Sequence, residues 1–430
     1  MRIAGVEVVA LAGQGRQGAY GAPYGVVVRL TADSGLVGHG EADSMPAVVR
    51  AVIEAPAIDE MMSGLKWVLL GQDPLDIEGL WRRMARATSG FGRDGASLHA
   101  MAAIDLALWD LKGKALGQPV HRLLGGARRR TLRCYATHPL GRDLAETAGF
   151  ASALRRAGFS AVKFGWSPLG PDPERDEAIV RCLRGAVGEE ADLLIDGGMA
   201  WDLPQALERC RRFAPSRPFW LEEPLPAYDF AGYARLRAAT PLTIAAGEMA
   251  AGEAELGRLA AESCVDVLQV DISRVGLTQG MRIAARAAAA GIPCVNHTYG
   301  YGISLAASLH FAAAIERTSL FEIQATPNEI REALVPDAPR PVDGMIAVPD
   351  GPGLGVQVDP AALARFAVAL TARARPARAP AGLVEIDAEA GASPGAAQPS
   401  TMRKAGARSS SSRQGSGSWS HSKYAPLGSA

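Results

Sequence analysis

The chain has 430 residues, of which 48% are hydrophobic and 21% charged, and its 45 basic side chains balance its 45 acidic ones. A chain without net charge has no broad attraction for nucleic acid or for an anionic membrane surface. The sequence also contains no apolar run of the roughly 18 residues that a membrane-spanning helix needs, so we expect a globular cytoplasmic enzyme.

Residues 1–125 predict a separate α+β domain. The sequence opens with MRIAGVEVVALAGQG, where Glu7 interrupts the apolar residues, so we expect a strand there and not a signal peptide. A further strand run turns at Asp33, Ser34 and Gly35, which is typical of a hairpin. An Ala-rich helix over residues 97–114 follows and is expected to stop before Gly117.

Residues 126–335 repeat a strand and a helix. The predicted strands are short and rich in Val, Ile, Leu and aromatic residues, and they occupy residues 132–136, 160–165, 192–196, 218–222, 242–248, 266–271, 291–297 and 319–323. They lack strict polar alternation, so each is expected to be covered on both faces. Glycines such as Gly158 and Gly188 suit the ends of the helices between them. This pattern predicts an α/β fold, a (β/α)7β TIM-like barrel whose eighth strand is followed by at most a short helix.

The end of the chain predicts two further segments. Residues 336–375 contain short strands and tight Pro/Gly turns, and we expect them to pack on the N-terminal domain. Residues 376–430 are rich in Ala, Pro, Ser and Gly, and we expect them to be disordered. The five cysteines lack CxxC spacing, so we expect buried thiols in a reducing compartment.

Seven ionisable residues recur through the barrel repeat at intervals of 23 to 33 residues. They are Lys163, Asp196, Glu222, Glu248, Asp271, His297 and Glu322, and most of them end a predicted strand. The C-terminal ends of all barrel strands surround one mouth, where active sites of this architecture lie. We therefore expect these seven side chains to meet in space.

Three of these residues predict a metal site. Asp196, Glu222 and Glu248 end three adjacent predicted strands, and two carboxylates about 4 Å apart repel by roughly 4 kcal/mol at an effective dielectric near 20. A hard divalent cation removes this repulsion, and an all-oxygen set suits Mg²⁺. The alternative is that arginines at the rim pair with these carboxylates. We expect one Mg²⁺ per active site, with Glu223 orienting one of the three ligands without binding the ion itself.

Asp271 and His297 predict a general base. They end two successive strands, and a carboxylate that holds one imidazole nitrogen fixes the tautomer of the ring and raises its basicity. The alternative is a histidine that only packs or caps a helix. The proximity of the three carboxylates favours the catalytic interpretation.

Several segments of the sequence resemble one known family. They read AAIDLALWDLKGKALGQPVHRLLGG (102–126), WLEEP (220–224), AAGE (245–248), QVDISRVGLTQG (269–280), GIPCVNH (291–297) and VPDGPGLG (348–355). Over residues 1–375 the chain resembles the mandelate racemase/muconate lactonizing branch of the enolase superfamily. The resemblance implies an α+β capping domain, a (β/α)7β barrel and a divalent cation, normally Mg²⁺, at its mouth. It also implies removal of a proton alpha to a carboxylate, which gives a metal-stabilised enediolate.

The resemblance also suggests roles for two strand-end residues. It implies that Glu322 is a protonated acid that hydrogen-bonds the substrate carboxylate, whereas the alternative is an ionised glutamate paired with a base. Lys163 would bind the substrate carboxylate or neutralise the acidic mouth. The racemases of the family carry Lys-x-Lys at this strand, but this chain has Gly165 in the second position, so one acid/base group is missing. A second departure is Gly198, where the family frequently has Asn.

The residues that would recognise substrate are less well marked. His138, Tyr299 and Tyr301 fall in loops near the mouth, although each could serve packing alone. Residues 14–24 form a Gly-rich segment that includes Tyr24 and resembles the family's loop that closes over substrate. The alternative for this segment is a surface loop without a role.

These features together predict a Mg²⁺-dependent dehydratase of an acid sugar, which is a lyase. The expected product is a 2-keto-3-deoxy acid, formed by loss of the α-proton and the β-hydroxyl. The alternatives are a racemase or epimerase of a 2-hydroxy acid in the same family, or a binding homologue without activity. We expect a small-molecule carboxylate substrate and a homo-oligomer, with no nucleic acid or membrane partner.

Overall fold

The computed structural model describes residues 1–13, 24–166 and 169–370. The predicted substrate-closing loop, except for Tyr24, and the predicted disordered tail lie outside these described residues. Among the helices of the described residues, none has the length and apolar character needed to cross a membrane.

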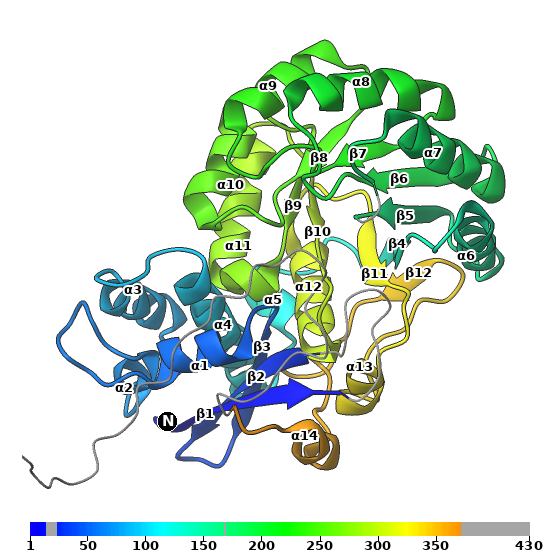
Figure 1. Cartoon of the computed structure of the whole chain (residues 1–430). Helices are drawn as coiled ribbons and strands as arrows, with labels where there is room; N and C mark the ends of the chain where they lie inside the picture. Colours follow the sequence, from blue (N-terminus) through cyan, green and yellow to red (C-terminus); the bar gives the residue numbers. More distant parts are fainter. Residues whose placement is uncertain (14–23, 167–168, 371–430) are drawn as a thin grey trace, which may run out of the picture. The chain divides into compact units, whose positions relative to one another are not determined.

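The N-terminal part forms an antiparallel sheet covered by helices (Figure 1). Its strands pair in the order β1, β2, β3, and the turn between β2 and β3 contains Gly35 at φ 84° as the hairpin signature predicts. The elements are β1 (Ile3–Ala12), β2 (Tyr24–Ala32), β3 (Val37–Ala42), α1 (Pro46–Glu54), α2 (Leu65–Leu69), α3 (Ile77–Ala87), α4 (Ala96–Leu116) and α5 (Val120–Leu123). The predicted α+β fold of this region is confirmed.

Two glycines allow the long helix α4 to approach the sheet. A Cβ at Gly40 of β3 would overlap the main-chain oxygen of Ala103, and one at Gly38 would overlap that of Ala107. Helix α4 stops before Gly117, as the sequence predicts, and Gly117 caps it in the left-handed conformation (φ 62°). The close contact places β3, and the residues that follow it, at a fixed height along α4.

The middle of the chain forms the predicted barrel of parallel strands wrapped by helices. Its strands are β4 (Thr131–Pro139), β5 (Ala161–Gly165), β6 (Asp192–Asp196), β7 (Trp220–Glu222), β8 (Ile244–Ala246), β9 (Val267–Val270), β10 (Cys294–Asn296) and β11 (Phe321–Gln324). Its helices are α6 (Leu144–Arg156), α7 (Pro173–Val187), α8 (Leu203–Phe213), α9 (Phe230–Ala239), α10 (Gly252–Ala261), α11 (Ile272–Ala289), α12 (Gly302–Ala314) and α13 (Glu329–Leu334). The helix that directly follows β11 is the short α13, as expected from the sequence.

Closure of the barrel differs at one junction from what the sequence predicts. The parallel ladder runs without interruption from β10 through β4 to β11, but no main-chain ladder joins β10 to β11 among the described residues. Instead, the side-chain Oδ1 of Asn296 in β10 accepts a hydrogen bond from the main-chain N of Glu322 in β11 (3.0 Å). A side chain therefore takes the place of the ladder at this seam.

The lower interior of the barrel is filled by its own apolar cluster. Each strand, or the residue before it, contributes one buried side chain: Tyr135, Ala161, Leu194, Trp220, Ala245, Val267, Val295 and Leu320. The large rings of Tyr135 and Trp220 meet edge to face with their centroids 5.4 Å apart. This layer closes the floor beneath the barrel mouth.

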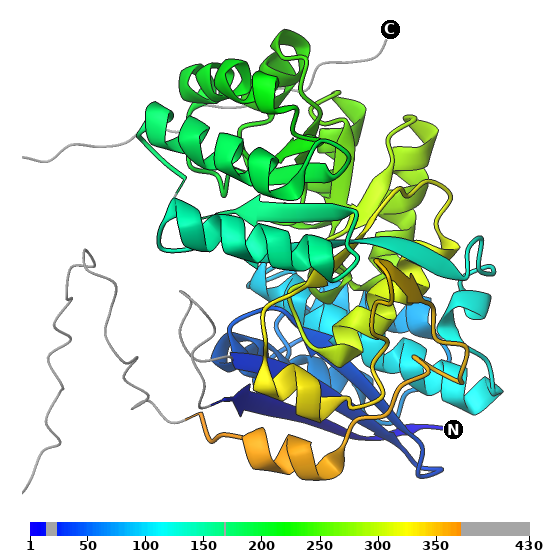
Figure 2. The same ribbon diagram turned by 90° about the vertical axis from the view of Figure 1, so that its right-hand side faces the viewer.

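The segment after the barrel, for which the sequence predicts packing on the capping domain, divides its contacts. Strand β12 (Met345–Ala347) pairs antiparallel with β4 of the barrel. Gly353 pairs with Pro119 next to α5, and α14 (Pro360–Phe366) lies beside β1 (Figure 1 and Figure 2). The segment thus touches both the barrel and the capping sheet.

Candidate active site

The seven strand-end residues meet at the barrel mouth, around a cavity of about 270 Å³. Five of them line the cavity directly, namely Lys163, Asp196, Glu248, His297 and Glu322. Glu222 and Asp271 contact these residues from behind and are fully buried. Apolar side chains would be expected at such depth, so this concentration of buried charge marks a functional site.

Asp196, Glu222 and Glu248 form an all-oxygen donor set. Asp196 and Glu222 are register partners on β6 and β7, and Glu248 follows the next strand, β8. Burial and the charge of Glu222 hold the pKa of Asp196 well above its usual value, and burial raises that of Glu248. Oε2 of Glu248 makes no hydrogen bond of regular geometry and has His297 Nε2 3.1 Å away as an ion-pair partner. Buried, mutually repelling carboxylate oxygens of this kind fit a hard divalent cation.

Lys163 supplies the positive charge among these carboxylates. Its Nζ lies 3.6 Å from Asp196 Oδ2 and 2.9 Å from Glu322 Oε1, and it also pairs closely with Glu222. Burial disfavours a charged lysine, but Glu222 and Glu322 outweigh it and hold the pKa of Lys163 well above its usual value. Lys163 therefore neutralises the acidic mouth in this structure, as one interpretation of the sequence expects.

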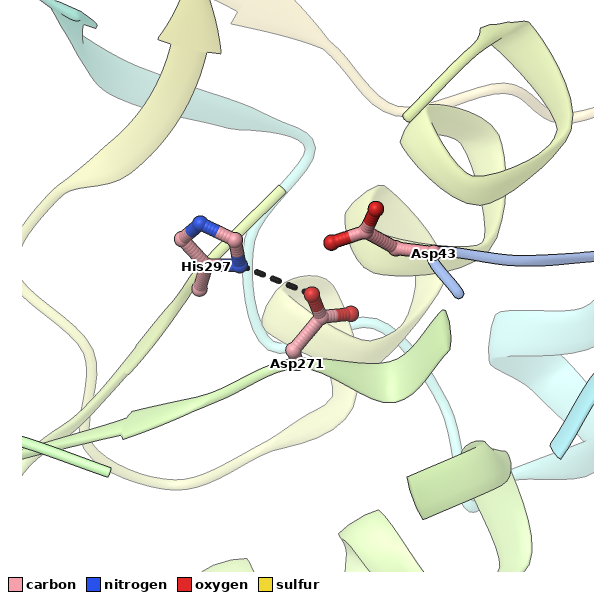
Figure 3. Close-up of side chains that lie close together, drawn as sticks. All are labelled: Asp43, Asp271 and His297. Atoms are coloured by element: carbon pink, nitrogen blue, oxygen red, sulfur yellow. Dashed lines mark hydrogen bonds and ion pairs between the residues drawn. The ribbon is translucent and has the colours of Figure 1, made fainter. Parts of the chain in front are cut away.

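His297 and Asp271 lie together as a hydrogen-bonded pair (Figure 3). His297 Nδ1 donates to Asp271 Oδ2 at 2.7 Å, which leaves Nε2 as the reactive nitrogen. Burial favours the neutral imidazole, but Glu248, Glu322 and the bond to Asp271 outweigh it and raise the pKa of His297 to about 10. Nε2 lies 3.1 Å from Glu248 Oε2. His297 can act as a base at neutral pH only if Glu248 Oε2 no longer stabilises the protonated ring. That would hold if Glu248 were bound to a metal ion.

Asp271 is held from the side opposite His297. Its Oδ1 accepts hydrogen bonds from the main-chain N and the Oγ of Ser273 (2.8 and 2.6 Å). Burial would raise the pKa of Asp271, but His297 and Arg274 outweigh it and lower the value to about 2. Asp271 therefore stays ionised and keeps the imidazole in one tautomer.

Two further residues at the mouth were not predicted from the sequence. Arg274 Nη2 lies 2.6 Å from Asp43 Oδ2, its Nη1 donates to the main-chain oxygen of Glu248 at 2.8 Å, and its Nε is 3.7 Å from Asp271 Oδ2. Asp43 follows β3 of the capping sheet and lines the cavity. Arg274 could have been found from its position one helical turn after Asp271, whereas Asp43 carries no local signal.

Asp43, Asp271 and His297 also have potential ligand atoms within 4.8 Å of one another (Figure 3). The guanidinium of Arg274 already lies against both carboxylates of this group. A cation there would meet the positive charge of Arg274, so the oxygens of Asp196, Glu222 and Glu248 suit a divalent cation better than this group does.

Glu322 and Glu223 make different contacts. Glu322 accepts a hydrogen bond at Oε2 from the main-chain N of Thr298 (3.0 Å), and its Oε1 faces Lys163. Glu223 accepts at Oε1 from the main-chain N of Gly247 (3.3 Å) and of Met249 (3.2 Å). These two amides flank Glu248, so Glu223 holds the turn that presents a carboxylate of the metal set.

Gly165, where the second lysine of the Lys-x-Lys pattern would stand, lies against β6. A Cβ at Gly165 would overlap the main-chain oxygen of Asp196 and crowd its Cβ. The next residue, Trp166, has a φ of 63° and lines the cavity, and a Cβ at Gly198 would lie 3.1 Å from its Cα. The strands leave no space for a side chain at position 165.

Replacing Gly165 by Ala is expected to lower the free energy of unfolding by about 1–3 kcal/mol, because the added methyl group pushes β5 away from β6. Urea unfolding of the metal-free protein measures this change. Gly185→Ala in α7 is the matched control, because its new methyl group meets open space. In a helix that change is expected to raise stability by roughly 0.5–1 kcal/mol. Equal destabilisation by both variants would contradict the close approach at position 165.

The predicted substrate-recognition residues lie in different places. His138 lines the cavity, and its Nδ1 donates to the main-chain oxygen of Pro139 (2.7 Å), which leaves Nε2 as an acceptor. Tyr299 also lines the cavity, whereas Tyr301 is buried against the capping sheet. Tyr24 begins β2, is 60% exposed and is not among the described residues that line the cavity.

Comparison with known families assigns both parts of the chain. Residues 16–125 match the N-terminal domain of mandelate racemase/muconate lactonizing enzymes, and residues 146–362 match the enolase C-terminal domain-like family. The first range contains β2 and β3 of the capping sheet, and the second contains β5 to β11 of the barrel with all seven strand-end residues. The sequence-based resemblance and the predicted fold class are therefore confirmed.

Individual relatives give the range of chemistry in this group. The chain is 33% identical to D-galactarolactone cycloisomerase of Agrobacterium fabrum over 79% of its length and 90% of that protein. It is 35% identical to D-galactonate dehydratase of Ralstonia pickettii, again over 79% of this chain and 90% of the relative. A racemase structure from Streptomyces coelicolor A3(2) with bound magnesium superimposes with a TM-score of 0.76 at 26% identity, over 85% of this chain and 100% of that one.

Proposed function

This chain belongs to the mandelate racemase/muconate lactonizing enzyme family of the enolase superfamily, and from that premise we propose that it dehydrates an acid sugar. The reaction is loss of the α-proton and of the β-hydroxyl, which gives a 2-keto-3-deoxy acid and water. The observation that carries the proposal is the one-sided site. It has a base, His297, on one side and no space for a second base at Gly165.

Asp196, Glu222 and Glu248 would hold Mg²⁺. When bound there, the cation would supply positive charge for the negative charge that develops on the substrate carboxylate as the α-proton leaves. Lys163 and Glu322, 2.9 Å apart, would contact the same substrate carboxylate.

His297 would remove the α-proton at Nε2, because Asp271 engages Nδ1 and fixes the tautomer. The protonated ring then carries a proton that it can return to the departing β-hydroxyl on the same face. The C–O bond breaks, water leaves, and the resulting enol tautomerises to the 2-keto acid. One side chain thus serves first as base and then as acid, which suits a site with a single dyad.

A racemase of the same family needs a second base on the opposite face of the substrate. The Lys-x-Lys pattern provides one in the family's racemases, but here position 165 is a glycine packed on Asp196. This contact argues against two-base proton transfer. A cycloisomerase, as two relatives are named, would use the same base and break the bond to a ring oxygen instead of a hydroxyl.

The test is a screen of mono- and diacid sugars with Mg²⁺ for 2-keto acid formation, with His297→Asn and Glu222→Gln as controls. A product about 18 mass units lighter than the acid has lost one water molecule, which supports dehydration. An isomer of unchanged mass supports a cycloisomerase or racemase. Equal product from the wild type and both variants would show that the assigned residues do not carry the reaction.

A further inference from the structure

The loop of residues 298–301 connects the base His297 to helix α12, and the capping domain holds it at its far end. At its near end, the main-chain N of Thr298 donates to Glu322 Oε2 (3.0 Å). At its far end, the main-chain N of Tyr301 donates to Glu41 Oε1 (2.5 Å), although Glu41 lies 260 residues earlier in β3. The loop is thus anchored to a proposed catalytic carboxylate and to the capping sheet.

Glu41 caps helix α12 from another domain. Tyr301, the N-cap residue of α12, offers no side-chain cap, so the first amides of the helix need an acceptor from elsewhere. Glu41 meets this need, because it also accepts from the main-chain N of Ser304 (3.1 Å) and from its Oγ (3.1 Å). A carboxylate at this position also interacts favourably with the helix dipole.

Close packing on both sides leaves the loop little freedom. A Cβ at Gly300 would overlap Oε1 of Glu41, and a Cβ at Gly25 of β2 would overlap the ring of Tyr301. Glu41 is only 1% exposed, and its burial raises the pKa of its carboxyl to about 7. Burial of the Glu41 carboxyl disfavours its ionised form, so its hydrogen bonds to the loop and to α12 are needed to keep it in this position.

We propose that Glu41 is a positioning residue through which the capping domain sets the loop after His297, and with it the Thr298 amide that holds Glu322. The proposal rests on the function proposed above for its effect on turnover, but the placement of the loop is independent of that function. In Glu41→Gln, one carboxylate oxygen becomes an NH₂ group that cannot accept from the main-chain N of Tyr301 or of Ser304, whichever it faces, and the loop loses part of its anchor.

Asp105 offers a matched control in the same domain. It is also a fully buried carboxylate of the capping domain whose burial raises its pKa to about 7. It accepts from the main-chain N and Oγ of Thr278 (2.9 and 2.6 Å), where α11 restarts after Gly276 at φ 75°. Asp105→Asn therefore disturbs a similar interdomain cap that does not touch the loop of residues 298–301.

Hydrogen exchange and steady-state kinetics on the full chain test the proposal. In Glu41→Gln, the amides of Thr298 and Tyr301 are expected to exchange faster than in the wild type, and kcat is expected to fall about 10- to 100-fold with an unchanged Kd for Mg²⁺. In Asp105→Asn, the exchange of these amides is expected to be unchanged and kcat to stay within about twofold, even at a similar loss of stability.

Unchanged exchange of Thr298 and Tyr301 in Glu41→Gln overturns the proposal. An equal fall of kcat in Asp105→Asn also overturns it, because the effect then reflects stability alone. If the wild type dehydrates no acid sugar in the screen, the proposed function fails, and the exchange measurement still decides whether Glu41 positions the loop.

Discussion

His297→Asn is expected to lower kcat for dehydration by about 10³-fold or more, within the range that a general base contributes. Nδ1 of His297 donates to Asp271, so Nε2 is the nitrogen available to take the α-proton. Asparagine can keep a hydrogen bond to Asp271 but cannot accept the proton. The measurement is 2-keto acid formation, together with deuterium exchange at the substrate α-carbon in D₂O. Both are expected to be lost.

A second buried histidine provides the control for this substitution. His310 lies in α12, packs on His121 and contacts the main-chain oxygen of Leu354 (3.1 Å), away from the cavity. His310→Asn is expected to reduce stability without a comparable fall in kcat. Retention of more than about a tenth of wild-type activity by His297→Asn is incompatible with a role as sole base.

Lys163→Met is expected to destabilise the metal-free protein by about 3–5 kcal/mol, because it leaves three buried carboxylates without their cation. Nζ of Lys163 contacts Asp196, Glu222 and Glu322, and the side chain is only 4% exposed. If Asp196 and Glu222 are metal ligands, bound Mg²⁺ replaces the positive charge lost with Lys163. Mg²⁺ should then stabilise Lys163→Met more than the wild type. Thermal unfolding with and without Mg²⁺ measures both effects.

Lys114→Met is the matched control for the metal dependence. Lys114 pairs with the buried carboxylate of Asp110 at 2.7 Å, in helix α4. Its loss removes an ion pair of the same chemical type, but not one at the barrel mouth. Mg²⁺ is expected to shift the unfolding of Lys114→Met and of the wild type equally. If Mg²⁺ also acts equally on Lys163→Met, then Asp196, Glu222 and Glu248 do not form the cation site.

The barrel and most of its mouth follow from local sequence. Apolar runs that end in an ionisable residue predict both a strand and the direction of its last side chain, which explains why Asp196, Glu222 and Glu248 could be placed together. Gly165 also carried information, since positions 163 and 165 of a strand face the same way. The structure adds the reason that no larger residue fits: a Cβ at position 165 would overlap the main-chain oxygen of Asp196.

Contacts between domains could not be read in the same way. Asp43 and Glu41 act on residues more than 200 positions later in the chain, and no sequence periodicity reports which edge of the capping sheet meets the barrel. Likewise, the main-chain N of Thr278, just after the break in α11 at Gly276, donates to Asp105, which lies 173 residues earlier in the chain.

The seam between β10 and β11 lies between the segments that carry His297 and Glu322. β10 leads to His297 and β11 carries Glu322, yet the described parts of these strands are linked by the Asn296 amide and not by a ladder. Every other pair of neighbouring barrel strands shares at least two register positions. The spacing between His297 and Glu322 is therefore set by two side chains, the Asn296 amide and the Glu322 carboxylate that accepts from the Thr298 main-chain N, and not by a main-chain ladder between the two strands.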